Sequence, residues 1–176
     1  MKQLLTVSAL GVDRTGMVHD MAHLVADCGG NILESRMTAL GGEFLLALLI
    51  AGNWHALAKI ETEVKKYATL HDLLLHLKRT EPRAVRADML PYSVDIVCLD
   101  QPGIVASVTG FFSSRGVDIS DLDSRSYTAN HTGAPMFSVR IIVNVPNRIH
   151  LGVLREEFMD FCDQLNLDAI LEPVKS

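Results

Sequence analysis

The sequence predicts an α+β protein in which one small fold is used twice in tandem. The first observation behind this prediction is an internal repeat, because residues 13–32, DRTGMVHDMAHLVADCGGNI, recur as residues 100–119, DQPGIVASVTGFFSSRGVDI. Matching positions lie 87 residues apart: Asp13 and Asp100, Gly16 and Gly103, Gly29 and Gly116, Asn31 and Asp118, and Ile32 and Ile119. The second observation is that strand-like and helix-like patterns alternate in the same order in both halves. Such self-similarity indicates a duplicated structural unit.

The composition is that of a globular protein, since 48% of the 176 residues are apolar and 21% are charged. A formal net charge of −5 argues against non-specific binding to nucleic acid, which depends on concentrated lysine and arginine. No run approaches the roughly 20 apolar residues that cross a bilayer, and the N-terminal segment is too short for a signal peptide. The three cysteines, Cys28, Cys98 and Cys162, are widely spaced, which suits a reducing compartment. We therefore expect a soluble, cytoplasmic protein that does not enter a membrane.

The first copy opens with a strand and an amphipathic helix. Residues 4–10 form a short run with β-branched members that ends at Gly11, which is typical of a strand. The apolar residues that follow recur at the spacing of one helix face: Met17, Val18, Met21, Leu24, Val25 and Cys28. We expect Asp13 or Thr15 to cap this helix and Gly29-Gly30 to end it.

Two strands, a second helix and a last strand complete the first copy. We expect strands at residues 32–40 and 44–50, joined by a tight turn at Gly41-Gly42. Residues 44–50, FLLALLI, are apolar throughout, which favours a strand that is covered on both faces. Asn53 is the expected cap of the second helix. The side chains expected to be buried on this helix are Leu57, Ile60, Val64 and Tyr67. Residues 70–78 are the predicted last strand.

A linker is expected where two prolines bracket a stretch without apolar periodicity, which places the first domain at residues 1–80, the linker at 81–91 and the second domain at 92–176. In the second copy we expect strands at residues 92–99, 119–128, 137–145 and 168–174, with helices that begin near Ile104 and Leu151. The offset between the copies grows from 87 to 94 before Leu151, and the loop through His131 is the expected site of the insertion. The order βαββαβ predicts a ferredoxin-like domain, a four-stranded antiparallel sheet with two helices on one face.

The turn between the first strand and the first helix of each copy is the candidate ligand site. A glycine there lets backbone N–H groups approach an anion, and the helix dipole favours a carboxylate. Asp13 or Asp100 could meet an ammonium group, and Asn31 or Asp118 lies where the next strand begins. Together these groups would suit a free amino acid. The alternative interpretation is structural, with aspartate as a helix cap and glycine as a turn residue.

The sequence predicts no enzyme and no metal site. His19 and His23 stand four residues apart on the first helix, with Asp27 one turn further on, and metal ligands can have this spacing. However, the glutamate of an H-E-x-x-H motif is missing, since Asp20 stands at its position, and a solvated helix face is the favoured interpretation. There is no Ser-His-Asp spacing, phosphate-binding loop or dinucleotide fingerprint. The basic residues are scattered and form no helix-turn-helix pattern, so direct reading of DNA is not expected.

Two βαββαβ units, each with a D-x-x-G turn and a later N-I or D-I pair, resemble tandem ACT domains, which are small regulatory modules that typically bind amino acids. The first copy is similar in more detail to the family of glycine cleavage system transcriptional repressors. The residues that carry this similarity are SALGVDRTGMV, CGGNILESRMTALGGEF, GNWHALAKIE and LKRT, all within residues 7–80. The second half contributes mainly GVDISDLDSR.

The resemblance implies an amino-acid-responsive regulator without a DNA-binding domain of its own. Such a protein would repress the glycine cleavage operon by contacting a DNA-bound activator of the LysR type, and glycine would relieve this contact. The residues that would touch the ligand are Asp13, Arg14, Thr15, Gly16, Asn31, Asp100, Gly103 and Asp118. A carboxylate at Asp118, where such sites often have asparagine, would repel the ligand, so the first copy is the better candidate. The alternative is an ACT-type regulatory subunit of an amino-acid metabolic enzyme, and a homo-oligomer is compatible with either function.

Overall fold

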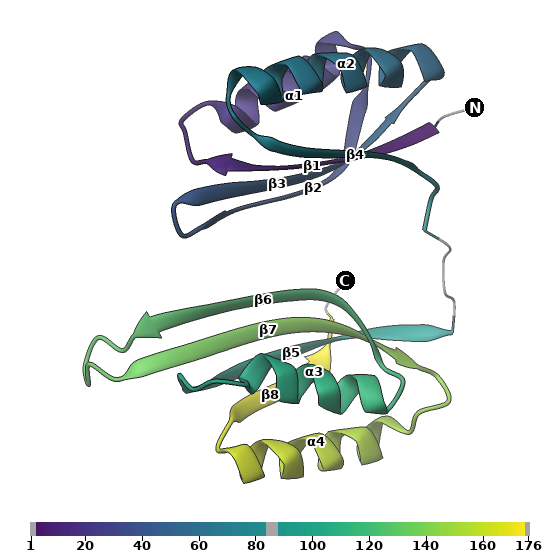
Figure 1. Cartoon of the computed structure of the whole chain (residues 1–176). Coiled ribbons are helices and arrows are strands. Elements are labelled where there is room, and N and C mark those ends of the chain that lie inside the picture. Colours follow the sequence, from purple (N-terminus) through teal and green to yellow (C-terminus); the bar gives the residue numbers. More distant parts are fainter. Residues whose placement is uncertain (1–2, 84–87, 175–176) are drawn as a thin grey trace. The chain divides into compact units, whose positions relative to one another are not determined.

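The computed structural model describes residues 3–83 and 88–174 of the chain. The chain divides into two units, residues 1–84 and 85–176. Within the described residues each unit contains four strands and two helices (Figure 1). Part of the predicted linker, residues 84–87, lies outside the described residues. Strand β5 already begins at Met89, so the end of the stretch that was predicted as linker belongs to the second sheet.

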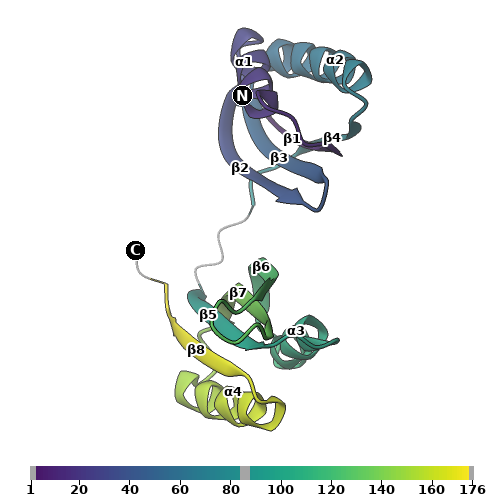
Figure 2. The ribbon, with the colours of Figure 1, turned by 90° about the vertical axis from the view of Figure 1, so that its left-hand side faces the viewer.

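The first unit has the predicted order βαββαβ. Its elements are β1 (Gln3–Val12), α1 (Met17–Asp27), β2 (Asn31–Leu40), β3 (Glu43–Gly52), α2 (Trp54–Leu70) and β4 (Leu74–Thr80). The strands pair antiparallel in the order β2-β3-β1-β4, and both helices cover one face of the sheet (Figure 2). The last strand was predicted to begin at residue 70 and begins at Leu74 instead. Leu70 ends α2 and is 78% exposed, and a left-handed residue, Asp72, then turns the chain into β4.

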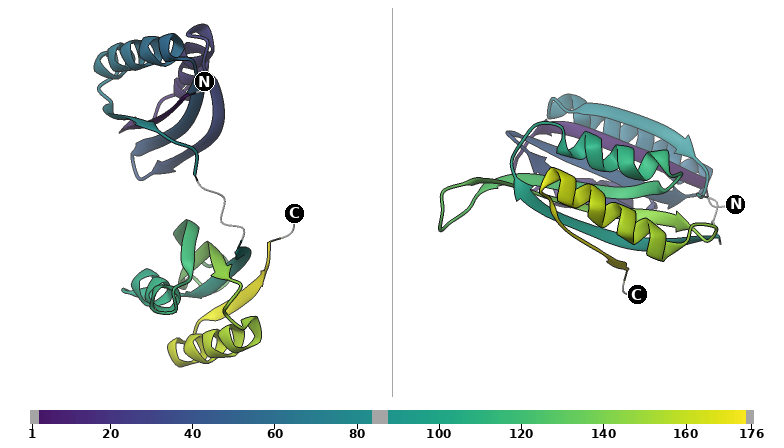
Figure 3. Two further views of the ribbon diagram at one scale, coloured as in Figure 1. Left: turned by 90° about the vertical axis from the view of Figure 1, so that its right-hand side faces the viewer. Right: turned by 90° about the horizontal axis from the view of Figure 1, so that it is seen from below.

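The second unit repeats this topology. Its elements are β5 (Met89–Leu99), α3 (Ile104–Ser114), β6 (Asp118–Thr128), β7 (Pro135–Pro146), α4 (Leu151–Leu165) and β8 (Asp168–Pro173). The strand order is β6-β7-β5-β8, and α3 and α4 again lie on one face (Figure 3). Ile32 and Ile119 are 87 positions apart in the sequence. Their strand partners, Ile50 and Val143, are already 93 positions apart. Six of the seven additional residues therefore lie in the β6–β7 hairpin, as expected.

Each unit has its own apolar core between the helices and the sheet. In the first unit, alternate residues of β1 and β3 pack against α1 and α2, and the buried residues include Leu5, Val7, Ala9, Met21, Val25, Leu46, Leu48, Ile50, Leu57, Ile60 and Val64. Asn53 caps α2 as predicted, because its Oδ1 accepts a hydrogen bond of 2.8 Å from the N–H of Ala56. Residues 44–50 were expected to be covered on both faces. The face of β3 that meets the helices is buried, whereas Leu45, Ala47 and Leu49 on the other face are half-buried.

The second core is more aromatic than the first. Phe111 packs edge-on against Phe112, and its ring centroid lies 5.3 Å from that of Phe158 and 5.0 Å from that of Phe161. On the face of its sheet that points away from the helices, β7 carries Arg140 at the position where β3 carries Ala47. The two units therefore share a fold but differ in the chemistry of their surfaces. Within residues 3–83 and 88–174, none of the helices has the length and apolarity needed to span a membrane.

A glycine in the left-handed conformation begins the first helix of each unit. Gly16 is the N-cap of α1 with φ of 93°, and Gly103 is the N-cap of α3 with φ of 91°. No side chain of the described residues caps either helix, so the expected capping by Asp13 or Thr15 is wrong. The physical reason is that a positive φ lets the glycine itself redirect the chain, with its carbonyl accepting the first helical hydrogen bond from Asp20 in α1.

Replacing Gly16 or Gly103 by alanine is expected to lower the free energy of unfolding by about 1–2 kcal/mol, because a Cβ atom disfavours the left-handed conformation. Open space surrounds both positions, so this loss would come from backbone strain rather than from a clash. Urea denaturation followed by circular dichroism measures it. The Gly42→Ala variant is a matched control, since Gly42 is surrounded by open space as well and is not left-handed. A loss as large at Gly42 as at Gly16 would contradict the explanation.

Candidate ligand site at the first strand–helix turn

The turn between β1 and α1 is held against the neighbouring hairpin and faces solvent. The N–H of Asp13 donates to the carbonyl oxygen of Gly42 at 3.5 Å, which ties the turn to the β2–β3 connection. Asp13, Thr15 and Gly16 are exposed, so their polar groups are accessible to a small molecule. Because Asp13 does not cap the helix, its carboxylate remains available to an ammonium group. The turn can thus offer a positive helix end and a carboxylate side by side.

Arg14 differs from its neighbours in the turn because its side chain folds back onto the two helices. Its Nη2 donates a hydrogen bond of 3.0 Å to Oδ2 of Asp20 in α1 and another to the hydroxyl of Tyr67 in α2. The Tyr67 hydroxyl donates in turn to the same Asp20 oxygen at 3.0 Å. The guanidinium carbon also lies 5.4 Å from the centroid of the Tyr67 ring. We call Arg14, Asp20 and Tyr67 the polar triad.

The electrostatics of the polar triad fix its charges near neutral pH. The hydrogen bond from Arg14, together with that from Tyr67, lowers the pKa of Asp20 below its ordinary value of 3.8. Burial raises the pKa of Tyr67 above its ordinary value of 10.0, and the bond to Asp20 adds to this effect. Asp20 is therefore anionic and Tyr67 neutral. Asp20 lies in the first turn of α1, where the helix dipole favours its negative charge.

Asn31 is the first residue of β2 and lies at the opposite end of the sheet from the turn. It pairs with Ala51, and Ala51 pairs with Leu4, whereas the turn follows Val12. Eight residues of extended strand separate Leu4 from Val12, a distance of about 26 Å. Asp13 and Asn31 therefore cannot contact one small molecule within a single unit. Binding of a ligand by either residue stays a prediction.

The second unit repeats this placement. The N–H of Asp100 donates to the carbonyl oxygen of Pro135 at 3.0 Å, and Asp100 and Gly103 are exposed in the β5–α3 turn. Asp118 is the half-buried first residue of β6, and its pairing with Asn144 places it at the far end of the sheet. Within each unit, the predicted ligand residues therefore fall into two separate places, a turn and a strand start.

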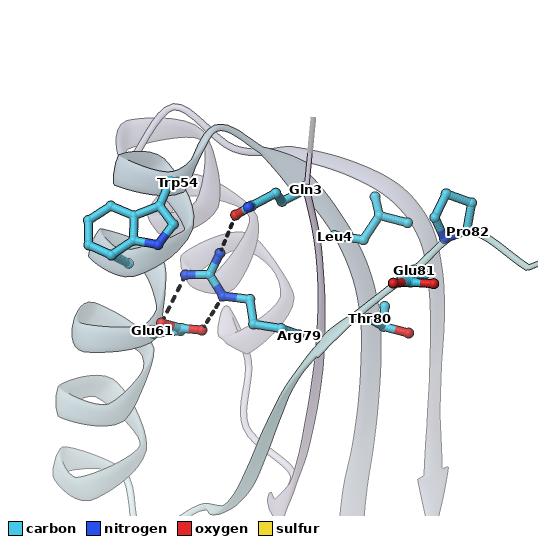
Figure 4. Close-up of a pocket in the computed structure, with 9 residues that line it drawn as sticks. Gln3, Leu4, Trp54, Glu61, Arg79, Thr80, Glu81 and Pro82 are labelled. Carbon is cyan, nitrogen blue, oxygen red and sulfur yellow. Dashed lines mark hydrogen bonds and ion pairs between the residues drawn. The ribbon is translucent and has the colours of Figure 1, made fainter. Parts of the chain in front are cut away.

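A pocket that the sequence did not predict lies between the start of β1, the first half of α2 and the end of β4. It has a volume of about 770 Å³ and is lined by Gln3, Leu4, Trp54, Ala58, Glu61, Arg79, Thr80, Glu81 and Pro82 (Figure 4). Nε and Nη2 of Arg79 donate to the two carboxylate oxygens of Glu61 at 2.5 and 3.1 Å. A third bond of 3.2 Å joins Nη1 to Oε1 of Gln3. No sequence signal links these three residues, because only the sheet and the helix packing bring them together.

The histidines and Asp27 of α1 and the three cysteines were the other candidates for chemistry. His23 and Asp27 lie 3.9 Å apart on exposed positions of α1, and the described part of the chain holds no group of three side chains that could bind a metal ion. Cys28, Cys98 and Cys162 are buried. Burial raises the pKa of the Cys162 thiol to about 11, so it is protonated at neutral pH.

Comparison with known proteins identifies the fold and the family. The family model of the ACT domain matches residues 3–78, which are nearly the whole first unit. The glycine cleavage system transcriptional repressor of Escherichia coli is 30% identical over 172 residues, which cover 97% of this chain and 90% of that protein. The chain belongs to the glycine cleavage repressor family. Its two units are tandem ACT domains of the ferredoxin-like class, as predicted.

Solved structures agree with this assignment. A crystal structure assigned to a glycine cleavage system transcriptional repressor superimposes with a TM-score of 0.71 at 29% identity and covers 100% of this chain and 99% of its own. A protein of unknown function from Galdieria sulphuraria superimposes with a TM-score of 0.80 at 24% identity over 99% of this chain and 100% of its own, which shows the shared fold. The assigned repressor thus shares this two-domain architecture over almost its full length.

Replacing Glu61 by glutamine is expected to remove the ion pair with Arg79. Because the hydrogen bond from Arg79 lowers the pKa of Glu61 in the folded protein, the pair stabilises the fold above the ordinary pKa of 4.5 and loses this effect as the pH falls through the folded-state pKa. For a partly exposed bidentate pair the contribution is about 1 kcal/mol. The Glu61→Gln variant should therefore be less stable than the unchanged protein at pH 7, by a margin that shrinks toward pH 3.

Urea denaturation at several pH values measures this margin. Glu63→Gln is the control, because within the described residues Glu63 forms its ion pair with the exposed Lys66 on the same helix. A difference for Glu61→Gln that does not change with pH would contradict the assignment of the effect to the ion pair.

Proposed function

We propose that this protein represses the glycine cleavage genes by contacting a DNA-bound activator of the LysR type, and that glycine is the effector that weakens the contact. The observation that carries the proposal is the 30% identity to a glycine cleavage system transcriptional repressor across almost the entire chain. The ACT fold supports a regulatory rather than a catalytic function. A net charge of −5 supports contact with a protein rather than with DNA. The protein would act in the cytoplasm, where the operon lies.

The effector would bind at the β1–α1 turn of the first ACT domain. The N-terminal end of α1 would face the carboxylate of glycine, and Asp13 would face its ammonium group. Asn31 lies about 26 Å from this turn within the same domain. We propose that it reaches the ligand only from a second copy of the chain, in a homo-oligomer. In the second domain, Asp118 in place of asparagine would disfavour the same ligand.

Isothermal titration with glycine tests the effector. We expect binding to the unchanged protein, and an affinity about tenfold lower for the Asp13→Ala variant, because the ammonium group loses its counter-charge. Asp100→Ala is the matched control in the second domain and should alter the affinity little. If the unchanged protein releases or absorbs no heat with glycine at millimolar concentration, glycine is not the effector.

Electrophoretic mobility shifts with the glycine cleavage operator test the partner. We expect the protein to leave free DNA unshifted, to retard the complex of DNA and LysR-type activator further, and to lose this effect when glycine is added. A shift of DNA without the activator would overturn the proposed contact. Co-purification of the protein with a metabolic enzyme, without any effect on the activator complex, would support a regulatory subunit instead.

A further inference from the structure

The polar triad beside the first turn has no counterpart in the second domain. Gln101 stands at the position of Arg14, Ser107 at that of Asp20 and Phe161 at that of Tyr67. In the second domain Phe161 packs against Phe111 with ring centroids 5.0 Å apart, and the guanidinium of Arg115 lies over the Phe111 ring. The same fold is therefore built without the Arg–Asp–Tyr triad. A structural requirement of the ACT fold does not account for the triad.

The triad also leaves one strong donor unsatisfied. Nε of Arg14 is buried and has no hydrogen-bond partner within the described residues. An unpaired buried N–H destabilises the conformation that contains it. The Arg14 side chain as a whole is 34% exposed, so it is not shielded from solvent. Asp20 and Tyr67 thus hold Arg14 in a conformation in which Nε has no acceptor. A conformation in which another group accepts a hydrogen bond from Nε would be more favourable.

We propose that Arg14 is the carboxylate-binding residue of the first ACT domain, and that Asp20 and Tyr67 are positioning residues that bind its guanidinium while no ligand is present. The inference rests on the proposed function, because it assigns the recognition of an amino-acid effector to this turn. A guanidinium binds a carboxylate through two parallel hydrogen bonds from neighbouring nitrogens. When Arg14 turns to a carboxylate at the turn, Nε and Nη2 both gain an acceptor, while the Tyr67 hydroxyl keeps its bond to Asp20.

This arrangement makes Asp20 a competitor of the effector. Its carboxylate and that of glycine are alternative partners for the same guanidinium, and the fraction of protein with Arg14 released sets the apparent affinity. Removing the charge at Asp20 should therefore strengthen binding, whereas removing the charge at Arg14 should weaken it. A triad that only stabilised the fold would not produce effects of opposite sign.

Isothermal titration of the full chain with glycine and with glycinamide, which lacks the carboxylate, tests the proposal. We expect the unchanged protein to bind glycine and not glycinamide. The affinity for glycine should fall about tenfold or more in Arg14→Gln, fall less in Arg14→Lys, and rise about threefold or more in Asp20→Asn. Ser107→Ala in the second domain is the matched control and should leave the affinity unchanged. Circular dichroism confirms that each variant is folded.

The outcomes separate this inference from the proposed function. Glycine binding in Arg14→Gln equal to that of the unchanged protein overturns the role of Arg14 and leaves glycine as the effector. Weaker binding in Asp20→Asn overturns the competition. Absence of glycine binding to the unchanged protein overturns the effector half of the proposed function together with this inference.

Discussion

The packing of two helices onto one face of a four-stranded antiparallel sheet is the constraint on which the rest of each domain depends. The apolar stripe of α1 and α2 meets the alternate residues of β1 and β3, and this contact removes most of the large aliphatic side chains from water. Because α1 must return along the sheet before β2 can begin, the strand–helix turn and the start of β2 lie at opposite ends. The separation of Asp13 from Asn31 is thus a direct consequence of the core.

The same constraint explains why the two domains can differ at the surface. Once the helix stripe and the glycine turn are in place, the corner between the turn and the second helix can be filled in more than one way. The first domain fills it with Arg14, Asp20 and Tyr67, and the second with a cluster of phenylalanines. Duplication of a fold therefore does not imply duplication of a site. The charged corner belongs to the domain whose sequence is closer to the repressor pattern.

The ion pair between Arg79 and Glu61 is a second polar contact between elements of the first domain. Arg79 comes from β4 and Glu61 from α2, and the guanidinium spans both carboxylate oxygens beside the exposed Trp54. Such a pair fixes the angle between helix and edge strand without entering the core. The first domain thus has polar contacts to the middle of α2, through Glu61, and to its last turn, through Tyr67.

The sequence by itself determined the duplicated βαββαβ order, the glycines that end the first helices, the cap at Asn53 and the place of the insertion. These features depend on local periodicity and on backbone conformations that few residues adopt, so they can be predicted from residues that are close together in the sequence. It missed the true start of β4, because a run of leucines has no period that separates a helix end from a strand. It also assigned the cap of α1 to Asp13 or Thr15. Only the tertiary structure decided that Arg14 meets Tyr67 across 53 positions, that Arg79 meets Glu61, and that Asp13 and Asn31 lie apart. These relations depend on strand register and on helix packing, which join residues that are distant in the chain.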